Sequence, residues 1–322
     1  MVQTPGTSRR LSRVQLLLSS LFGAGIPTFS CVGVGAQASW RTECVSVRVA
    51  MAQVDCRLGA VDENIAEAER TVKEAAAEGA DLVVFPELSV NGYALGTVED
   101  SSLSANDPRL LALSRLGPDV VVGFHEDGRL RRFNAAVYLS DGEVVHVHRK
   151  LYLPNYLSWE ERKHSSPGQA IRAFDTRLSR MATLICNDAW QPMLPWLAAH
   201  DGAEVMLVPT NSAEGLAPGS VDTAQYWSDL LLSIARLQQC WVVFVNRVGE
   251  ESGARFWGGS RVLDPWGRVV AQAPVGESSL TVVDLDLTQV RRRRRELPLL
   301  QEARLGLVAR EVQRLIAEGA DS

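Results

Sequence analysis

The sequence predicts an α/β protein built of layers, in which strands and helices alternate from about residue 46 onward. Continuous apolar runs of strand length, at 81–85 and 240–245, are typical of strands that are buried on both faces. Segments with apolar residues at helical spacing lie between such runs, and a Ser-Asp-Gly sequence at 140–142 predicts a hairpin turn. Strands in βαβ order together with hairpins indicate mixed sheets covered by helices.

The first half of this pattern begins with an apolar strand and an amphipathic helix. The strand is expected at 46–54, and Asp62 is expected to be the N-cap of the helix that follows. Gly79 suits the position just after that helix, where a left-handed residue commonly ends it. The next strands are expected at 81–85, 119–124, 133–139 and 143–148, and the last two form the hairpin.

The second half contains further buried strands and two long helical patterns. Strands are expected at 180–185, 204–208, 240–245 and 280–283, with two short ones on either side of Pro265-Trp266-Gly267. Helices are expected at 222–239 and, as a terminal amphipathic helix, at 297–317. Because 46–302 holds neither an internal repeat nor a linker, we expect one domain over 46–310, followed by a helix end and tail at 311–322.

Composition excludes several classes of protein. The chain has 322 residues, a net charge of −5, 46% hydrophobic and 22% charged residues, which are ordinary values for a packed domain. These values argue against disorder and against a nucleic-acid binder that relies on bulk positive charge. The five cysteines are too few and too scattered for a disulfide scaffold. Because the sequence contains no CxxC pair, a structural zinc site is not expected.

The first 45 residues differ from the rest and have the parts of a secretory signal peptide. Arg9, Arg10 and Arg13 precede an uncharged stretch at 14–40, and Ala-Gln-Ala at 36–38 resembles a cleavage site. Four glycines and Pro27 interrupt the stretch, so a membrane-spanning helix is not expected. On this interpretation the mature protein is exported.

A start codon placed too far upstream explains the same leader equally simply. An initiator at Val45 or Val47 would put the strand at 47–54 at the N-terminus of a cytoplasmic protein. We favour this second interpretation. Mass spectrometry of the mature N-terminus distinguishes the two, because a first residue at Ser39 excludes the upstream start.

Three reactive side chains directly follow predicted strands. Glu87 comes after the apolar run at 82–86, Lys150 follows the second arm of the hairpin, and Cys186 follows the strand at 180–185. Strand ends are where α/β sheets present binding residues. A cysteine after a buried strand is by itself an ordinary small apolar residue. Together, however, a thiol, a carboxylate and an ammonium group can supply a nucleophile, its base and an oxyanion stabiliser.

The segments that carry these residues resemble a known family. GADLVVFPE at 79–87, HRKLYLP at 148–154 and LICNDAW at 184–190 resemble, in the same order, the three signature blocks of the nitrilase superfamily of carbon–nitrogen hydrolases. Shorter likenesses occur at 155–161, 167–168, 246–249 and 256–260, so the resemblance covers about 46–310. It implies a four-layer α-β-β-α sandwich that associates, through the region of the cysteine, as a homodimer or larger homo-oligomer.

The resemblance also implies a role for each matching residue. Cys186 is similar to the nucleophile, Glu87 to the general base, and Lys150 to the cation that stabilises the oxyanion. The backbone N–H of Asn187 is expected to be a second oxyanion donor, and Glu161 matches the glutamate that positions the lysine and the substrate. No metal and no cofactor are expected.

Substrate recognition is less defined by the sequence. Tyr93, Trp190 and Asn211 are candidates to line the pocket, whereas Trp227 lies on an apolar helix stripe that predicts a core residue. The region around 155–161 is most similar to glutaminase domains of NAD synthetases, but the sequence has no phosphate-binding loop. The residues after Cys186 are more similar to amidases than to true nitrilases.

We therefore expect hydrolysis of a small-molecule linear amide or N-carbamoyl compound through a thioester. Nitrile hydrolysis and N-acyl transfer are alternatives, as is a pseudo-enzyme that keeps the fold as a scaffold. His146 and His148 share one face of a strand, which is the spacing of a metal-binding pair but only weak support for a zinc hydrolase. Position 148 is often Tyr in members of the family that the sequence resembles. Five arginines at 291–295 could bind nucleic acid or an anionic membrane. We expect instead that this run forms a solvated surface turn or an oligomer contact, because the chain as a whole is acidic.

Overall fold

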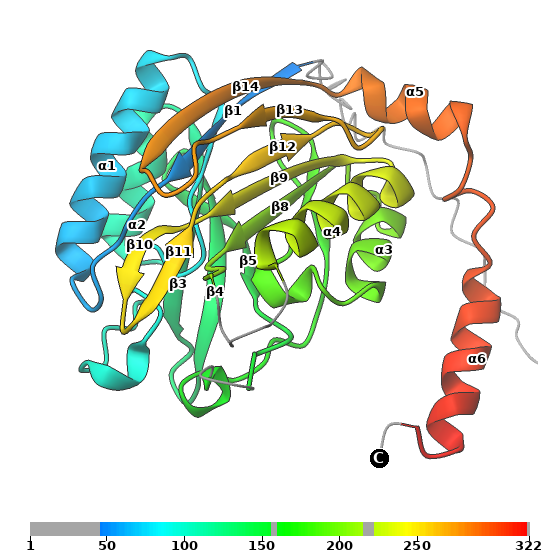
Figure 1. Cartoon of the computed structure of the whole chain (residues 1–322), viewed down its shortest axis with the longest axis horizontal. Helices are drawn as coiled ribbons and strands as arrows, with labels where there is room; N and C mark the ends of the chain where they lie inside the picture. Colours follow the sequence, from blue (N-terminus) through cyan, green and yellow to red (C-terminus); the bar gives the residue numbers. More distant parts are fainter. Residues whose placement is uncertain (1–45, 156–159, 215–221, 321–322) are drawn as a thin grey trace, which may run out of the picture. The chain divides into compact units, whose positions relative to one another are not determined.

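Two six-stranded mixed sheets form the centre of the fold, in a computed structural model that describes residues 46–155, 160–214 and 222–320 (Figure 1). The leader at 1–45, part of the segment at 155–161, the stretch at 215–221 and the last two residues lie outside the described residues. The first sheet has the order β14 (Ser279–Asp286), β1 (Ser46–Gln53), β2 (Leu82–Val84), β3 (Asp119–Asp127), β4 (Arg132–Ser140) and β5 (Glu143–Arg149). The second has the order β13 (Val269–Gln272), β12 (Arg261–Leu263), β9 (Trp241–Asn246), β8 (Val205–Thr210), β7 (Arg180–Thr183) and β6 (Ala173–Asp175).

Parallel strands lie at the middle of each sheet and antiparallel strands at its margins. β1, β2 and β3 pair in parallel, as do β7, β8 and β9. A separate two-stranded hairpin consists of β10 (Val248–Glu251) and β11 (Ala254–Trp257). The carboxyl ends of the parallel strands are therefore available to hold a site, as in other α/β proteins.

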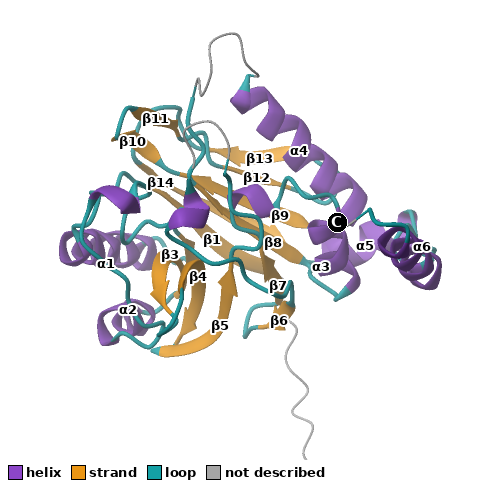
Figure 2. Cartoon of the chain, turned by 90° about the horizontal axis from the view of Figure 1, so that it is seen from below, coloured by secondary structure: helices purple, strands orange, loops and turns teal. Residues whose placement is uncertain are grey.

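Helices cover the outer face of each sheet, as Figure 2 shows with the sheets in orange between the purple helices. α1 (Val61–Ala77) and α2 (Pro108–Leu113) pack on the first sheet, and α3 (Met193–His200) and α4 (Thr223–Gln238) pack on the second. α5 (Thr288–Glu296) and α6 (Leu305–Ala317) follow the last strand. Short 3-10 helices occur at η1 (Leu95–Thr97), η2 (Ser114–Leu116), η3 (Glu161–Lys163) and η4 (Cys186–Asp188).

Three apolar cores separate the layers. One lies between the first sheet and its helices and includes Ile65 and Phe124. A second lies between the two sheets and includes Met51 and Leu207, and a third packs α4 on the second sheet through residues such as Leu231. Because both faces of the central strands are buried, their sequences are apolar runs without alternation. The predicted α-β-β-α sandwich is confirmed.

The predicted hairpin turn and the predicted end of α1 are confirmed, whereas the predicted N-cap of α1 is wrong. Asp141 and Gly142 both have positive φ, 52° and 79°, as the tight turn between β4 and β5 requires. Gly79 has a φ of 75° and follows α1 as expected. Asp62 is not the N-cap, because α1 begins at Val61 and its N-cap is Ala60. Asp62 lies instead in the first turn, where its charge suits the helix dipole.

The prediction of one terminal helix over 297–317 was wrong. The chain forms α5 and α6 with an irregular stretch between them. Pro298 explains the break, since it lacks an N–H group and disfavours a helical conformation at the residue before it. None of the described residues of α6 is buried. No helix in the described part of the chain is both long and apolar enough to cross a membrane.

The arginine run is helical and much of its charge is used within the chain, so the predicted surface turn was also wrong. Arg294 donates to the backbone oxygen of Ala203 at 2.6 Å, and Arg292 donates to Glu296 at 2.8 Å, one turn further along α5. The guanidinium of Arg292 also lies 5.6 Å from the ring centroid of Trp266. Side chains tied in this way are poorly placed to bind a polyanion.

Candidate active site

The predicted catalytic residues converge from the ends of strands in both sheets. Glu87 follows β2 and Lys150 follows β5 in the first sheet, while Cys186 follows β7 in the second. Cys186 and Leu88, the residue after Glu87, both have a φ of 46°, in the left-handed region that non-glycine residues rarely adopt. Such strained turns at strand ends are typical of functional sites, where they present a side chain that a regular strand would turn away.

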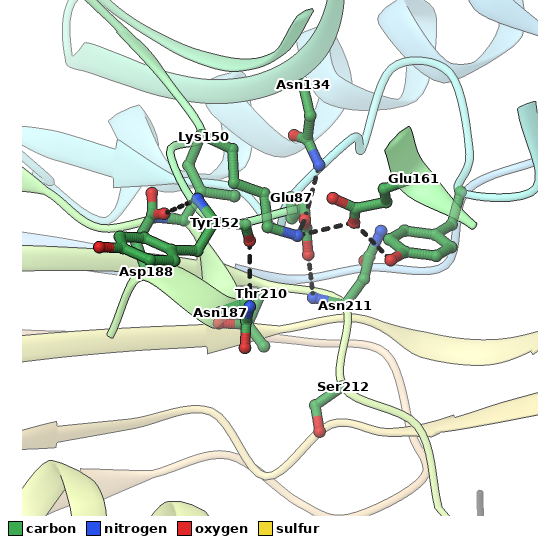
Figure 3. Close-up of polar contacts among 12 residues, drawn as sticks. Glu87, Asn134, Lys150, Tyr152, Glu161, Asn187, Asp188, Thr210, Asn211 and Ser212 are labelled. Carbon is green, nitrogen blue, oxygen red and sulfur yellow. Dashed lines mark hydrogen bonds and ion pairs between the residues drawn. The ribbon is translucent and has the colours of Figure 1, made fainter. Parts of the chain in front are cut away.

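Lys150 is fully buried between two carboxylates. Its Nζ lies 2.6 Å from Oε1 of Glu87 and 2.7 Å from Oε1 of Glu161, as Figure 3 shows. Burial alone would lower the pKa of Lys150, but the charges of Glu161 and Glu87 outweigh it and raise the pKa well above its usual value. Lys150 is therefore a permanent cation at a fixed position, as an oxyanion stabiliser must be.

Two further groups orient the carboxylate of Glu87. Oε1 accepts a hydrogen bond from Nδ2 of Asn134 at 2.7 Å, and Oε2 accepts one from the backbone N–H of Asn211 at 2.9 Å. Asn134 was not predicted from the sequence, although a single amide within the apolar strand β4 was a usable signal, because a buried polar group needs a partner. The candidate Asn211 thus contacts the site through its backbone.

Glu161, in η3, is held by Tyr93 as well as by Lys150. The hydroxyl of Tyr93 donates to Oε1 of Glu161, the same oxygen that accepts from Lys150. Burial raises the pKa of Glu161 to about 7, and Lys150 and Tyr93 limit this rise while Glu87 adds to it. Burial, followed by the charge of Glu161, raises the pKa of Tyr93 well above normal, so its hydroxyl stays protonated and donates.

Cys186 is partly exposed and its thiol is neutral in the resting site. Burial of the thiol is the largest cause that raises the pKa of Cys186 well above its usual value, and the negative charge of Glu87 adds to it. The positive charge of Lys150 opposes this rise. A thiol of raised pKa is a weak nucleophile until a base removes its proton. Attack by this thiol therefore needs a nearby base, and the carboxylate of Glu87 lies close enough to influence the pKa of Cys186.

Asp188 joins the segment of Lys150 to the turn of Cys186. Its Oδ1 accepts the backbone N–H groups of Leu151 and Tyr152, each at 2.9 Å, and its Oδ2 lies 2.9 Å from Nε2 of His148. The carboxylate and the imidazole are both buried. His148 thus takes part in this connection between the two segments.

The weak zinc interpretation gains no support from the two histidines. His146 stacks on Phe174 with ring centroids 4.3 Å apart, and His148 is engaged by Asp188. No group of three or more His, Cys, Asp and Glu side chains suited to a metal ion occurs within 46–155, 160–214 and 222–320.

Comparison with known protein families matches residues 48–295 to the model of the carbon–nitrogen hydrolases. The chain belongs to the carbon–nitrogen hydrolase family. The predicted membership of the nitrilase superfamily is therefore confirmed. A solved structure of an amidase variant from Nesterenkonia AN1, described as a member of that superfamily, has a TM-score of 0.69 and 26% identity over 82% of this chain and 96% of its own.

Curated relatives of this carbon–nitrogen hydrolase differ in activity. A glutamine-dependent NAD(+) synthetase of Thermotoga maritima is 32% identical over 252 residues, which are 76% of this chain but 42% of the synthetase. An N-carbamoylputrescine amidase of Arabidopsis thaliana is 24% identical, over 76% of this chain and 88% of the amidase. The chain thus spans less than half the length of that synthetase.

A cavity lies beside Glu161, and the residues that line it do not include Glu87, Lys150 or Cys186. Its volume is about 390 Å³. Its wall includes Tyr93, Leu95, Asn134, Glu161, Glu251 and Phe256. The cavity is large enough for a small amide or for the non-reacting part of a longer one.

The side chains of the remaining candidates, Trp190 and Asn187, contact residues other than Glu87, Lys150 and Glu161. Trp190 stacks on Tyr226 with centroids 5.9 Å apart and meets Trp227 edge-on at 5.5 Å. Trp227 is buried and donates its Nε1–H to Oγ of Ser212, which confirms it as a core residue. The side chain of Asn187 donates to the backbone oxygen of Tyr152, whereas the predicted oxyanion contact concerns its backbone N–H.

Gly123 lets β3 approach the backbone of the Glu87 segment. A Cβ added at Gly123 would lie 2.4 Å from both the nitrogen of Leu88 and the oxygen of Pro86. We expect Gly123→Ala to displace Glu87, lowering kcat/KM about 10- to 100-fold and stability by about 1–3 kcal/mol. Steady-state kinetics and urea unfolding measure both quantities.

Gly306→Ala is the control for Gly123→Ala, since the new Cβ lies 3.6 Å from the Arg310 guanidinium in exposed helix α6. Activity is expected to stay unchanged in this control, and stability to rise by no more than about 1 kcal/mol, because alanine favours a helix more than glycine does. Wild-type activity in Gly123→Ala would show that the Glu87 segment does not depend on this close approach.

Proposed function

We propose that the protein hydrolyses the C–N bond of a linear amide or N-carbamoyl compound through a thioester on Cys186. One observation carries this proposal: the buried ammonium of Lys150 is held between Glu87 and Glu161 beside a neutral thiol on a strained turn. A protein that serves only as a scaffold does not need the buried charges of Lys150, Glu87 and Glu161, because burying charges costs free energy and apolar side chains would pack there without that cost.

In the first half-reaction Cys186 attacks the amide carbon. Glu87 accepts the thiol proton as the S–C bond forms, and the carbonyl oxygen becomes an oxyanion facing the ammonium of Lys150 and the backbone N–H of Asn187. The intermediate collapses when Glu87 returns the proton to the amide nitrogen. The C–N bond breaks, ammonia or an amine leaves, and a thioester remains on Cys186.

In the second half-reaction water attacks the thioester. Glu87 accepts a proton from the water as the new C–O bond forms, and the oxyanion again lies against Lys150. Collapse breaks the C–S bond, the sulfur regains a proton from Glu87, and the carboxylic acid is released. Amide and water are thus converted to acid and ammonia without a net change at the enzyme.

Unpaired buried acceptors favour an amide over a nitrile. Within the described chain, Oδ1 of Asn134 and Oε2 of Glu161 are buried without a hydrogen-bond partner. Asn134 donates its Nδ2 to Glu87, which fixes its oxygen as the free atom. An amide or carbamoyl NH₂ can donate to such acceptors, whereas a nitrile has no N–H.

The relatives agree with this class. In one structure of the Nesterenkonia amidase, the acetamide moiety of fluoroacetamide is attached covalently to the active-site cysteine; that chain is 26% identical to this one, with a TM-score of 0.70. The plant relative is an N-carbamoylputrescine amidase. A carbon–nitrogen bond with an adjacent carbonyl is common to both compounds.

Ammonia release from a defined panel tests the proposal. The panel contains short aliphatic amides, glutamine and other ω-amides, N-carbamoyl amines and amino acids, and the nitrile matching each amide. We expect ammonia from at least one amide or carbamoyl compound and not from its nitrile. Ammonia from nitriles alone would contradict the amide assignment, and a panel without turnover or Cys186 acylation would favour the scaffold. Adding hydroxylamine detects acyl transfer as a hydroxamate.

A further inference from the structure

The hairpin β10–β11 reaches the catalytic site through one buried carboxylate. Glu251, the last residue of β10, accepts two consecutive backbone N–H groups on its Oε1, from Tyr93 at 2.8 Å and Ala94 at 2.7 Å. Its side chain is only 6% exposed. Two hydrogen bonds from adjacent residues to a buried anion fix the path of that segment firmly.

Arg247 in turn holds Glu251 in place. Its Nη1 donates to Oε2 of Glu251 at 2.7 Å, and its Nη2 donates to the backbone oxygen of Cys56 at 2.7 Å and to Asp55 at 3.1 Å. The guanidinium also lies over the ring of Phe256, 4.6 Å from its centroid. Arg247 thereby ties the chain beyond β1 to both strands of the hairpin, and Glu251 cannot shift without breaking these contacts.

Tyr93 connects this assembly to the catalytic charges. Its hydroxyl donates to the oxygen of Glu161 that also accepts from Lys150. The position of the Tyr93 backbone therefore determines where the hydroxyl, and with it Glu161, can lie. The same residues border the cavity described above, since Tyr93, Glu161 and Glu251 all line it.

We propose that Glu251 is a positioning residue of the hydrolase, which, held by Arg247, fixes Tyr93 so that its hydroxyl keeps Glu161 against Lys150. The inference rests on the function proposed above. Glu251 acts through Tyr93, so a purely structural alternative is that the Arg247–Glu251 pair only stabilises the hairpin. The two possibilities differ in what happens to catalysis in the folded enzyme.

The pH dependence of catalysis separates them. Tyr93 and Lys150 donate hydrogen bonds to Glu161, and the charges of Glu87 and of an ionised Cys186 also act on it. Losing the Tyr93 donor removes stabilisation from the ionised form of Glu161, which raises its pKa further. If catalysis needs ionised Glu161, the acid limb of the pH–rate profile moves to higher pH. A loss of hairpin stability alone does not move this limb.

The experiment compares Glu251→Gln, Tyr93→Phe and the double variant with the wild type, using the best substrate of the panel. In Glu251→Gln the amide nitrogen must face either Arg247 or the backbone N–H groups, all of which are donors. We expect each single variant to lower kcat about 10-fold, to change KM less, and to shift the acid limb upward. The double variant should be no slower than the slower single variant, because both changes act on one linkage.

Glu250→Gln is the matched control, since Glu250 is the exposed neighbour on the same strand and should keep wild-type kinetics. A wild-type kcat and acid limb in Tyr93→Phe, or effects that multiply in the double variant, would overturn the proposal. If Glu251→Gln does not fold, Arg247→Lys replaces it, with a smaller shift expected in the same direction.

Alkylation of Cys186 by iodoacetamide provides a readout that does not need turnover. Its rate, followed by peptide mass across pH 5–9, reports on the same charges, and we expect Tyr93→Phe and Glu251→Gln to change its pH dependence alike. If the wild type hydrolyses no compound of the panel, the proposed function fails, while this profile still supports or refutes the positioning role.

Discussion

Cys186→Ala is expected to abolish hydrolysis of every substrate of the enzyme. Thioester formation requires the sulfur of Cys186, and without a nucleophile only binding and oxyanion stabilisation remain. Loss of such a nucleophile lowers kcat by at least about 10⁴-fold. The other described cysteines cannot substitute, because Cys56 and Cys240 are buried and burial raises the pKa of each to about 12.

Ammonia release at saturating substrate, with urea unfolding of the same preparation, measures this effect. Alanine carries a Cβ as cysteine does, so it meets the same cost at the φ of 46° and the variant should fold. Cys240→Ala is the control and should keep its activity, since Cys240 lies in the core around α4. Turnover by Cys186→Ala above about 1% of the wild type would remove Cys186 from the nucleophile role.

The architecture could be predicted because strands that are buried on both faces have continuous apolar sequences. The apolar runs of β2, β8 and β9 correspond to segments with every residue buried. Short elements gave no such signal: α2 has six residues, and α3 is apolar on all sides, so neither shows helical periodicity. The hairpin β10–β11 was missed because its strands have four residues each and include charged ones.

The convergence of the three candidate catalytic residues could be predicted from motifs at strand ends, whereas the groups that orient them could not. Glu87, Lys150 and Cys186 each stand in a recognisable segment. Glu251 contacts Tyr93 across 158 positions of sequence. A single sequence contains no information on such a pairing, because it depends on how the hairpin packs on the loop after β2.

Lys150→Met is expected to remove both activity and a large part of the stability, in a manner that depends on pH. Lys150 is fully buried, and the ammonium compensates Glu87 and Glu161, which are almost as deeply buried. Methionine fills much of the same space without the charge. Loss of an oxyanion donor costs about 10²- to 10³-fold in kcat, and two buried carboxylates left without their cation cost about 3–5 kcal/mol at pH 8.

The sign of the pH effect follows from proton binding. Without Lys150, the pKa of Glu161, already raised to about 7 by burial, loses the main influence that lowers it and rises further. A carboxyl whose pKa is higher in the folded than in the unfolded state binds more protons when folded, so stability is greatest below the unfolded value and falls as pH rises through the folded one. The difference in unfolding free energy between wild type and Lys150→Met should therefore grow from pH 5 to pH 8.

Urea unfolding at pH 5, 6.5 and 8 measures this difference without any assay of activity. Lys163→Met is the matched control, because Lys163 pairs with Glu160 at the surface, where the two side chains are 61% and 54% exposed. An exposed pair of this kind contributes about 1 kcal/mol or less, and the loss should hardly change with pH. Equal destabilisation of Lys150→Met at all three pH values would mean that the ammonium does not neutralise the two buried carboxylates. The geometry predicts otherwise: both carboxylates lie within 2.7 Å of Nζ of Lys150, so the ammonium that we expect to stabilise the oxyanion is also the charge that stabilises the fold.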